Sequence, residues 1–389
     1  MSQPSTRMKL YLPDECWESV FNFLPYQKSL SLISKRFLSI TNNLRSSLTI
    51  LPATPLGLLP HLIYIRFPNL TSLHIRHIYL SEFFVRPIYT SNYSLIRLRD
   101  LAVEKNKSTC PFKSITFHNI INITDDDLIL IVECFSSIQQ LDISSYRSCD
   151  RDVTDIGIRT LSIGLTKLRK VVISGYFIND SKLVILCKHS PLLEKVIITC
   201  DKYITQHGIA SAIKQMLNLV SFSVKRFNFE NNSPDLIASL MGLRNMTFLD
   251  LSFSCISDEL LISIAKVHVS LKKLVLRGCR GYNYVGIYIL LLKCRLVQHL
   301  DLHDTEFLED EHIIELSKFL SHLKFIDLSD CSNITDLGLS ALTKNCPLLN
   351  HMKTKEPPKT WTDIGRFCCK LSIEDEEILR DEGRCNCWI

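Results

Sequence analysis

The chain has 389 residues, of which 46% are hydrophobic and 22% charged, so it can bury a sizeable core, and a globally disordered or collagen-like chain is excluded. Its net charge of +5, from 45 basic and 40 acidic residues, is too small and too mixed to predict a nucleic-acid-binding surface. Uncharged apolar runs stay shorter than the roughly 20 residues that a membrane span needs, so no membrane association is expected.

The first 46 residues predict a flexible stretch, residues 1–9, followed by short consecutive helices over residues 10–46. Leu12-Pro13 stands where a helix would begin, and apolar residues then follow at spacings of three and four as far as Pro25. Considered alone, this segment is either a small cap for the domain that follows or a separate helical module.

The fifteen cysteines are expected to be reduced, buried thiols. This expectation follows from the absence of an apolar signal core near the N-terminus, where Asp14, Glu15 and Glu18 lie instead. The predicted localisation is therefore the cytoplasm, the nucleus or both.

Residues 47–371 repeat an apolar-x-x-apolar-x-apolar pattern, as in Leu323-Lys-Phe-Ile326-Asp-Leu328. Successive middle positions are separated by 30, 25, 26, 27, 25, 26, 26 and 26 residues, which lies close to the roughly 20–29-residue period of leucine-rich repeats. The middle positions are Leu141, Val171, Val196, Phe222, Leu249, Leu274, Leu300, Ile326 and Met352.

Upstream, the period continues through Leu48 and Leu73 and then becomes ambiguous. Leu101 and Ile115 both fit the pattern but lie only 14 residues apart, so one of them belongs to an irregular insert near residues 84–111. Taken together, the repeated pattern predicts an α/β leucine-rich-repeat solenoid, a horseshoe of about 11–12 repeats of about 26 residues.

Each repeat combines a short strand with a helix. The apolar-x-apolar core predicts the strand, and about nine residues later a Ser, Thr or Asn followed by Asp predicts a helix start, as in Thr154-Asp155 and Thr335-Asp336. The same signal at Thr362-Asp363 predicts that the last repeat keeps its helix, and residues 372–389 are expected to form a C-terminal cap or tail.

The outward positions of the strands form the predicted binding face. Val172 and Ile197 are apolar where a wet face is expected, with Lys170 and Lys195 beside them, so an acidic partner segment is one hypothesis and β-propensity alone is the other. Three aspartates, Asp250, Asp301 and Asp327, lie further along this face. The candidate substrate-binding residues are Lys170, Val172, Lys195, Ile197, Lys225, Phe248 and Arg277.

The N-terminal helices resemble the F-box. The resemblance lies in the opening Leu12-Pro13, the helix end Val20-Phe21…Leu24-Pro25 and the run Ile33-Ser34-Lys35-Arg36-Phe37, with departures at Trp17, Ser29 and Ser31. It implies binding of the Skp-type adaptor of a cullin-based ubiquitin ligase through an apolar helical face. Carried over residue by residue, the implied adaptor contacts are Leu12, Pro13, Val20, Leu24, Pro25, Leu30 and Ile33.

The repeats resemble the cysteine-containing class, since Cys331 follows Leu328 as Cys279 follows Leu276. An F-box followed by such repeats is similar to the F-box/LRR family, of the plant type. The resemblance implies a substrate-recognition subunit of an SCF-type ligase, a monomer within a hetero-complex that binds the adaptor, through it cullin, and a target protein. Two alternatives stay open: a repeat scaffold outside any ligase, and a small-molecule receptor in which Lys225, Lys273 and Arg277 line a basic pocket.

No motif for catalysis or cofactor binding is present, so we expect no enzyme activity and no cofactor. Cys368, Cys369, Cys385 and Cys387 could in principle offer four thiolates to zinc, but they lack the usual paired Cys-x-x-Cys spacing. We therefore expect no metal.

Overall fold

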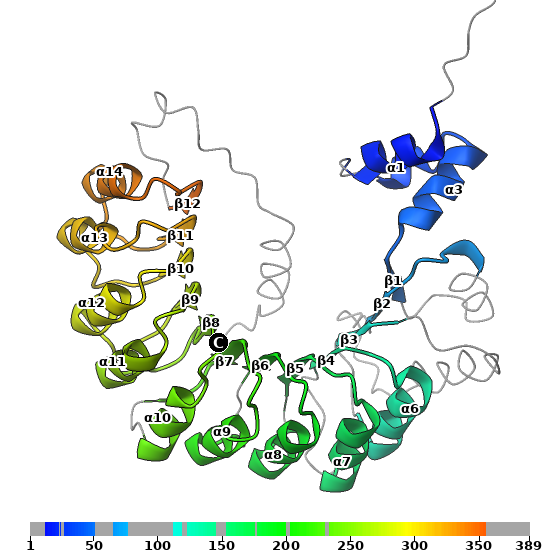
Figure 1. Cartoon of the computed structure of the whole chain (residues 1–389), viewed down its shortest axis with the longest axis horizontal. Coiled ribbons are helices and arrows are strands. Elements are labelled where there is room, and N and C mark those ends of the chain that lie inside the picture. Colours follow the sequence, from blue (N-terminus) through cyan, green and yellow to red (C-terminus); the bar gives the residue numbers. More distant parts are fainter. Residues whose placement is uncertain are drawn as a thin grey trace, which may run out of the picture. The chain divides into compact units, whose positions relative to one another are not determined.

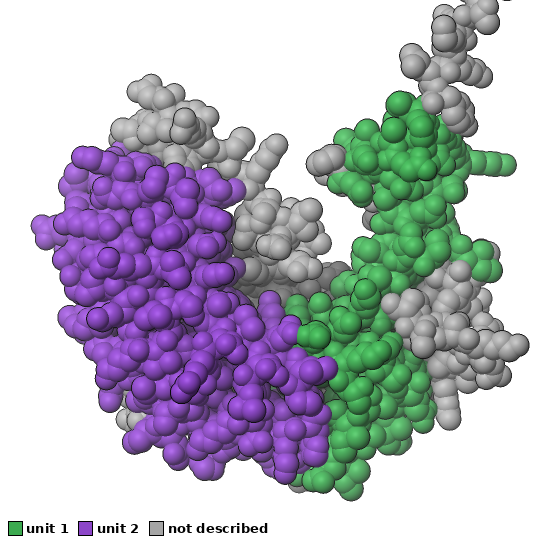
Figure 2. Space-filling model, viewed as in Figure 1, with its two compact units in different colours: residues 1–177 green, residues 178–389 purple. Residues whose placement is uncertain are grey.

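The computed structural model describes residues 12–22, 24, 27–50, 65–76, 112–118, 123–144, 153–175, 177–199, 203–229 and 233–354. The chain forms two compact units, residues 1–177 and 178–389 (Figure 2). The predicted insert near residues 84–111, the helix expected after Thr362, the tail 372–389 and the four cysteines considered for zinc lie outside the described residues.

Unit 1 begins with three short helices and continues with parallel strands (Figure 1). The helices that belong to repeats pack on one side of the strands (Figure 1). The helices are α1 (Asp14–Asn22), α2 (Gln27–Leu30), α3 (Lys35–Leu44), α6 (Asp125–Phe135) and α7 (Asp155–Gly164). The strands are β1 (Ser47–Ile50), β2 (Ser72–Arg76), β3 (Ser114–His118), β4 (Gln140–Ser144) and β5 (Lys170–Ser174).

Unit 2 alternates helix and strand throughout its described part. Its helices are α8 (Asp180–His189), α9 (Gln206–Ile213), α10 (Pro234–Met241), α11 (Asp258–Val267), α12 (Tyr284–Lys293), α13 (Asp310–Ser317) and α14 (Asp336–Asn345). Its strands are β6 (Lys195–Thr199), β7 (Ser221–Lys225), β8 (Phe248–Asp250), β9 (Lys273–Val275), β10 (His299–Asp301), β11 (Phe325–Asp327) and β12 (His351–Lys353).

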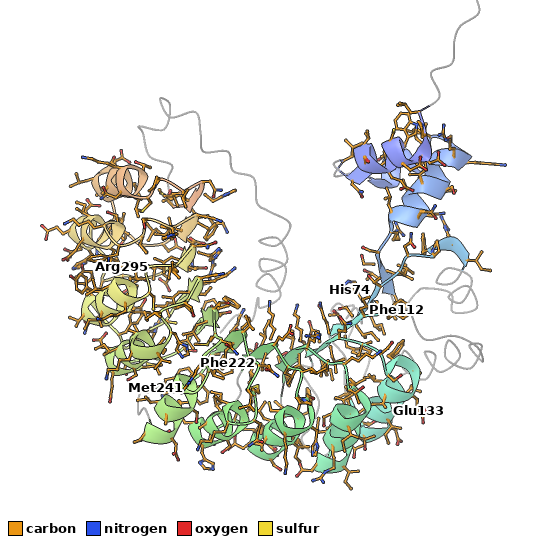
Figure 3. All side chains as sticks on the ribbon, viewed as in Figure 1. His74, Phe112, Glu133, Phe222, Met241 and Arg295 are labelled. Carbon is orange, nitrogen blue, oxygen red and sulfur yellow. The ribbon has the colours of Figure 1, made fainter. Side chains whose placement is uncertain are left out.

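The middle apolar residues of the repeat stand opposite one another across the parallel strands. In unit 2 the register aligns Val196 with Phe222, Phe222 with Leu249, and so on to Met352. These side chains form the core: Phe222, labelled in Figure 3, is 1% exposed and Leu249 is fully buried. The predicted leucine-rich-repeat solenoid is therefore confirmed.

The ambiguity upstream is settled by strand pairing. Leu73 of β2 is aligned directly with Ile115 of β3, and Ile115 with Leu141 of β4. Ile115 therefore holds the repeat position, and the step from Leu73 to Ile115 is longer than the others. Leu101 lies outside the described residues.

Hydrogen bonds link the starts of several pairs of neighbouring repeat helices. In unit 1 the backbone N–H and hydroxyl of Thr154 donate to the carboxylate of Asp125, at 2.8 and 2.5 Å. In unit 2 Thr205 does the same to Asp180, and Thr335 to Asp310. The helix-start aspartate thus binds the cap of the following repeat as well as favouring the positive end of its own helix.

Glycine is required beside each of these carboxylates. A Cβ added at Gly157 would lie 1.9 Å from Oδ1 of Asp125, and one at Gly208 equally close to Oδ1 of Asp180. The glycine three residues after each of the caps Thr154 and Thr205 therefore reflects close packing between neighbouring helix starts.

Six of the described cysteines are buried and none forms a disulfide. The thiol of Cys279 donates to the carbonyl of Leu251, one repeat earlier, at 2.8 Å, and Cys331 donates to Leu302 at 3.2 Å. Burial raises the pKa of Cys279 to about 12 and that of Cys331 to about 11. Cys279 and Cys331 are thus neutral, buried thiols, as expected from the sequence, and their hydrogen bonds also tie adjacent turns together.

Candidate interaction surfaces

The N-terminal helices enclose a small aromatic core. The ring of Phe37 lies 4.8 Å from that of Trp17 and 5.0 Å from that of Phe21, between centroids, and Phe21 is 1% exposed. Trp17, noted above as a departure from the F-box pattern, is therefore a packing residue that joins α1 to α3.

Polar contacts fix the same helices. Ser34 caps α3 by accepting the backbone N–H of Phe37. Arg36 pairs with Asp14 at 2.6 Å and donates to the carbonyl of Leu12 at 2.5 Å, which ties the start of α1 to α3. The Ser34-Lys35-Arg36-Phe37 run is thus explained by folding of the helices themselves.

Large apolar side chains remain on the outside of this module. Leu12, Val20 and Leu24 are 44%, 46% and 41% exposed, and in the turn after α2 Ile33 is 65% and Leu32 86% exposed. Of the other implied adaptor contacts, Pro13 is exposed, Leu30 is half-buried and Pro25 lies outside the described residues. Leu32 was not among the predicted contacts, although it is the most exposed of the group.

A column of basic and aromatic residues runs along the first outward position of the strands in unit 2. Lys195 and Lys273 place their Nζ atoms 5.7 and 5.4 Å from the ring centroid of Phe248. Further along, the His299 ring stacks on Phe325 with centroids 4.0 Å apart. The strand pairing places the members in register, in the order Lys195, Ser221, Phe248, Lys273, His299, Phe325 and His351.

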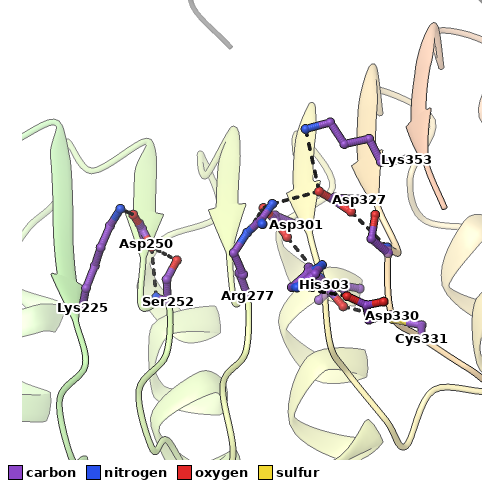
Figure 4. Close-up of polar contacts among 12 residues, drawn as sticks. Lys225, Asp250, Ser252, Arg277, Asp301, His303, Asp327, Asp330, Cys331 and Lys353 are labelled. Carbon is purple, nitrogen blue, oxygen red and sulfur yellow. Dashed lines mark hydrogen bonds and ion pairs between the residues drawn. The ribbon is translucent and has the colours of Figure 1, made fainter. Parts of the chain in front are cut away.

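The next column contains the three strand aspartates, and the structure corrects their predicted exposure. The three side chains, whose polar contacts are drawn in Figure 4, are only 6%, 4% and 2% exposed for Asp250, Asp301 and Asp327. Arg277 donates to Asp301 and to Asp327, at 2.9 Å each, and Lys225 lies 3.4 Å from Asp250. These carboxylates are internal anions rather than part of a wet surface.

The second oxygen of each aspartate closes the turn after its strand. The Oδ1 atoms of Asp250, Asp301 and Asp327 accept the backbone N–H two residues later, at 3.0, 3.1 and 3.0 Å. Burial raises the pKa of Asp301, an effect that Arg277 opposes. The aspartates therefore stabilise the repeat junctions.

The seven predicted substrate-binding residues divide between the units. Lys170 and Val172 lie on β5 of unit 1, and the other five lie on unit 2. Val172 is buried, at 9% exposure, so it does not supply the exposed apolar surface that was expected, whereas Ile197 is half-buried. Lys225 and Arg277 are engaged with aspartates, and Phe248 lies between two lysines.

Sequence reasoning missed this internal pairing, although a signal for it exists. Lys225 and Arg277 each stand three positions after a middle apolar residue, one repeat before an aspartate at the outward strand position. Because neighbouring strands are parallel and in register, that offset places opposite charges side by side.

The described residues contain no cluster of three or more His, Cys, Asp or Glu side chains that could hold a metal ion. Within the same part of the chain, none of the helices is long and apolar enough to cross a membrane.

No family model matches the chain. A chain of the yeast Rad7–Elc1 complex is 14% identical, with a TM-score of 0.46 over 66% of this chain and 75% of that one. The leucine-rich-repeat-containing protein LegL7 of Legionella pneumophila is 13% identical, with a TM-score of 0.45 over 87% and 98%. An internalin, InlF, of Listeria monocytogenes is 13% identical, with a TM-score of 0.39 over 87% and 93%. These similarities concern the fold alone.

Proposed function

We propose that this chain is a non-catalytic substrate-recognition subunit of an SCF-type cullin-RING ubiquitin ligase. In this proposal the N-terminal helices bind the Skp-type adaptor, and the strand side of the repeats binds a target protein. The chain supplies proximity and orientation, while the chemistry takes place on another subunit.

The observation that carries the proposal is the exposure of apolar side chains on a module that already has its own core. Leu12, Val20, Leu24 and Ile33 are between 41% and 65% exposed, whereas Phe21 of α1 and Ile40 of α3 are nearly fully buried. Burying such side chains against a partner contributes about 25 cal/mol per Å² of apolar area. Several exposed apolar side chains on one small module are typical of an interaction site.

The test is a titration of the purified chain with a Skp-type adaptor, followed by calorimetry. Val20→Glu and Ile33→Glu should each weaken binding at least about tenfold, or about 1.4 kcal/mol, because each puts a charge into the interface. Thermal unfolding should barely change, since both positions are exposed.

Ile156→Glu provides the matched control, because Ile156 is a 74% exposed apolar residue on the repeat helix α7. It should bind the adaptor as the wild type does. A chain that does not bind the adaptor, or that binds equally well with Glu at positions 20 and 33, would leave the alternative of a repeat scaffold outside any ligase.

A small anionic ligand is the weaker alternative. Two of the three basic residues considered for it, Lys225 and Arg277, form ion pairs with buried aspartates. The basic and aromatic column of unit 2 instead offers an extended surface that suits a protein segment.

A further inference from the structure

The turns that follow the strands β7 to β11 of unit 2 each contain one residue in the left-handed backbone region. In four of these turns the N–H of that residue donates to a carbonyl of the next repeat, as from Phe253 to Arg277 at 2.7 Å and from Gly278 to His303 at 2.9 Å. The stacking of repeats therefore imposes this conformation whatever residue is present. The residues, with φ between 58° and 62°, are Arg226, Phe253, Gly278, Asp304 and Asp330.

Phe253 is the residue least suited to this position. Glycine adopts positive φ without a steric penalty and aspartate tolerates it, whereas a bulky side chain there is an outlier. The side chain of Phe253 is also 50% exposed, so burial in the core does not account for the aromatic ring. Strain and exposure together at one residue indicate a role outside folding.

The ring of Phe253 is held in place by the following repeat. A Cβ added at Gly278 would lie 2.8 Å from Cδ1 and 3.1 Å from Cε1 of Phe253, so the ring rests against the Cα of Gly278. An aromatic side chain fixed in this way loses little conformational freedom when a partner covers it.

The turns before and after that of Phe253 each carry an exposed arginine. Arg226, one repeat earlier at the same turn position, is exposed, as is Arg280, whose N–H donates to the carbonyl of Ser254 at 3.0 Å. After Gly278, the two remaining turn residues in the series, Asp304 and Asp330, are acidic. The positive charge at this edge is thus concentrated around Phe253.

We propose that Phe253, with Arg226 and Arg280, anchors an acidic segment of the target protein that carries a leucine or aromatic side chain. The apolar side chain packs on the Phe253 ring, and carboxylates beside it approach the two arginines. The inference rests on the proposed function only in one respect: it takes the target protein to be the partner that binds here. It does not depend on adaptor binding.

The test uses the full chain and a phage-displayed library of random twelve-residue peptides. Selection should enrich peptides in which acidic residues flank a leucine or aromatic residue. Phe253→Asn should weaken the enriched peptides at least tenfold while leaving the midpoint of thermal unfolding unchanged or higher, because asparagine suits positive φ. A purely structural role for Phe253 would instead lower that midpoint.

Asp304→Asn is the matched control, since it changes the same turn position two repeats further on and should retain peptide affinity. The proposal is overturned if no such peptides are enriched, or if Phe253→Asn binds them as the wild type does. It is also overturned if Lys273→Glu, on the strand column, abolishes binding that Phe253→Asn leaves intact. Adaptor titration of the same variants reports separately on the N-terminal helices.

Discussion

Two sets of aspartates occupy different ends of the same repeat. At the helix starts, Asp125, Asp180, Asp258 and Asp310 are half-buried and accept hydrogen bonds from neutral hydroxyl and backbone N–H donors. At the strands, Asp250, Asp301 and Asp327 are almost fully buried, and each has a basic side chain within reach. The comparison shows that neutral donors suffice for a half-buried carboxylate here, whereas the deeply buried ones also have counter-charges.

Removal of Arg277 should have the largest effect. Arg277→Met leaves Asp301 and Asp327 without their shared guanidinium, and breaking a buried pair in this way costs about 3–5 kcal/mol of unfolding free energy. Urea unfolding measures the loss, with Arg280→Met as an exposed control expected to stay within about 0.5 kcal/mol.

The loss should also depend on pH. Burial raises the pKa of Asp301, and Arg277 opposes that effect, so Arg277→Met should raise the pKa further. The folded variant then binds a proton more tightly than the unfolded chain, so the destabilisation is greatest at neutral pH and shrinks on acidification. A loss that stayed constant between pH 7 and pH 4 would show that the arginine acts through packing instead.

Adding a methyl group at a helix start should have the next largest effect on the free energy of unfolding. Gly286→Ala would place a Cβ 2.2 Å from Oδ1 of Asp258 and so should cost about 1–3 kcal/mol. In an Asp258→Ala background the same change should cost clearly less, because the carboxylate is gone and alanine favours the helix by up to about 1 kcal/mol. A double-mutant cycle by urea unfolding checks this, and additive effects would contradict the close packing described above.

Substitution of His268 should have the smallest effect on stability. It extends the comparison from buried acids to a buried base. Its Nε2 lies 2.9 Å from the carbonyl of Leu240, a neutral partner, and burial lowers its pKa. A lowered pKa means that stability is present above the ordinary histidine pKa and is lost as the pH falls through the folded value.

His268→Leu should therefore flatten the fall in stability between pH 7 and pH 5. Thermal unfolding at several pH values measures this, with the exposed His322→Leu as control. If the stability of His268→Leu depended on pH as that of the wild type and of the control does, His268 would not be the responsible group.

The sequence allowed the repeat register and the helix starts to be predicted, because both depend on local pattern. Leu274 and Leu300 had to point inward, and Thr335-Asp336 had to begin a helix. Burial of the strand aspartates escaped prediction because it depends on side chains from neighbouring strands. The special position of Phe253 escaped it because the backbone conformation of the turn is set by hydrogen bonds between repeats.

The buried thiols make the folding of individual repeats measurable. With the pKa of Cys187, Cys294 and Cys346 at about 12, almost no thiolate is present near neutral pH, and these side chains are covered. A cysteine-directed reagent should modify the exposed Cys16 at once but reach the others only when their own part of the stack opens. The rate at which each sulfur is labelled would therefore report how often that segment opens in the native protein.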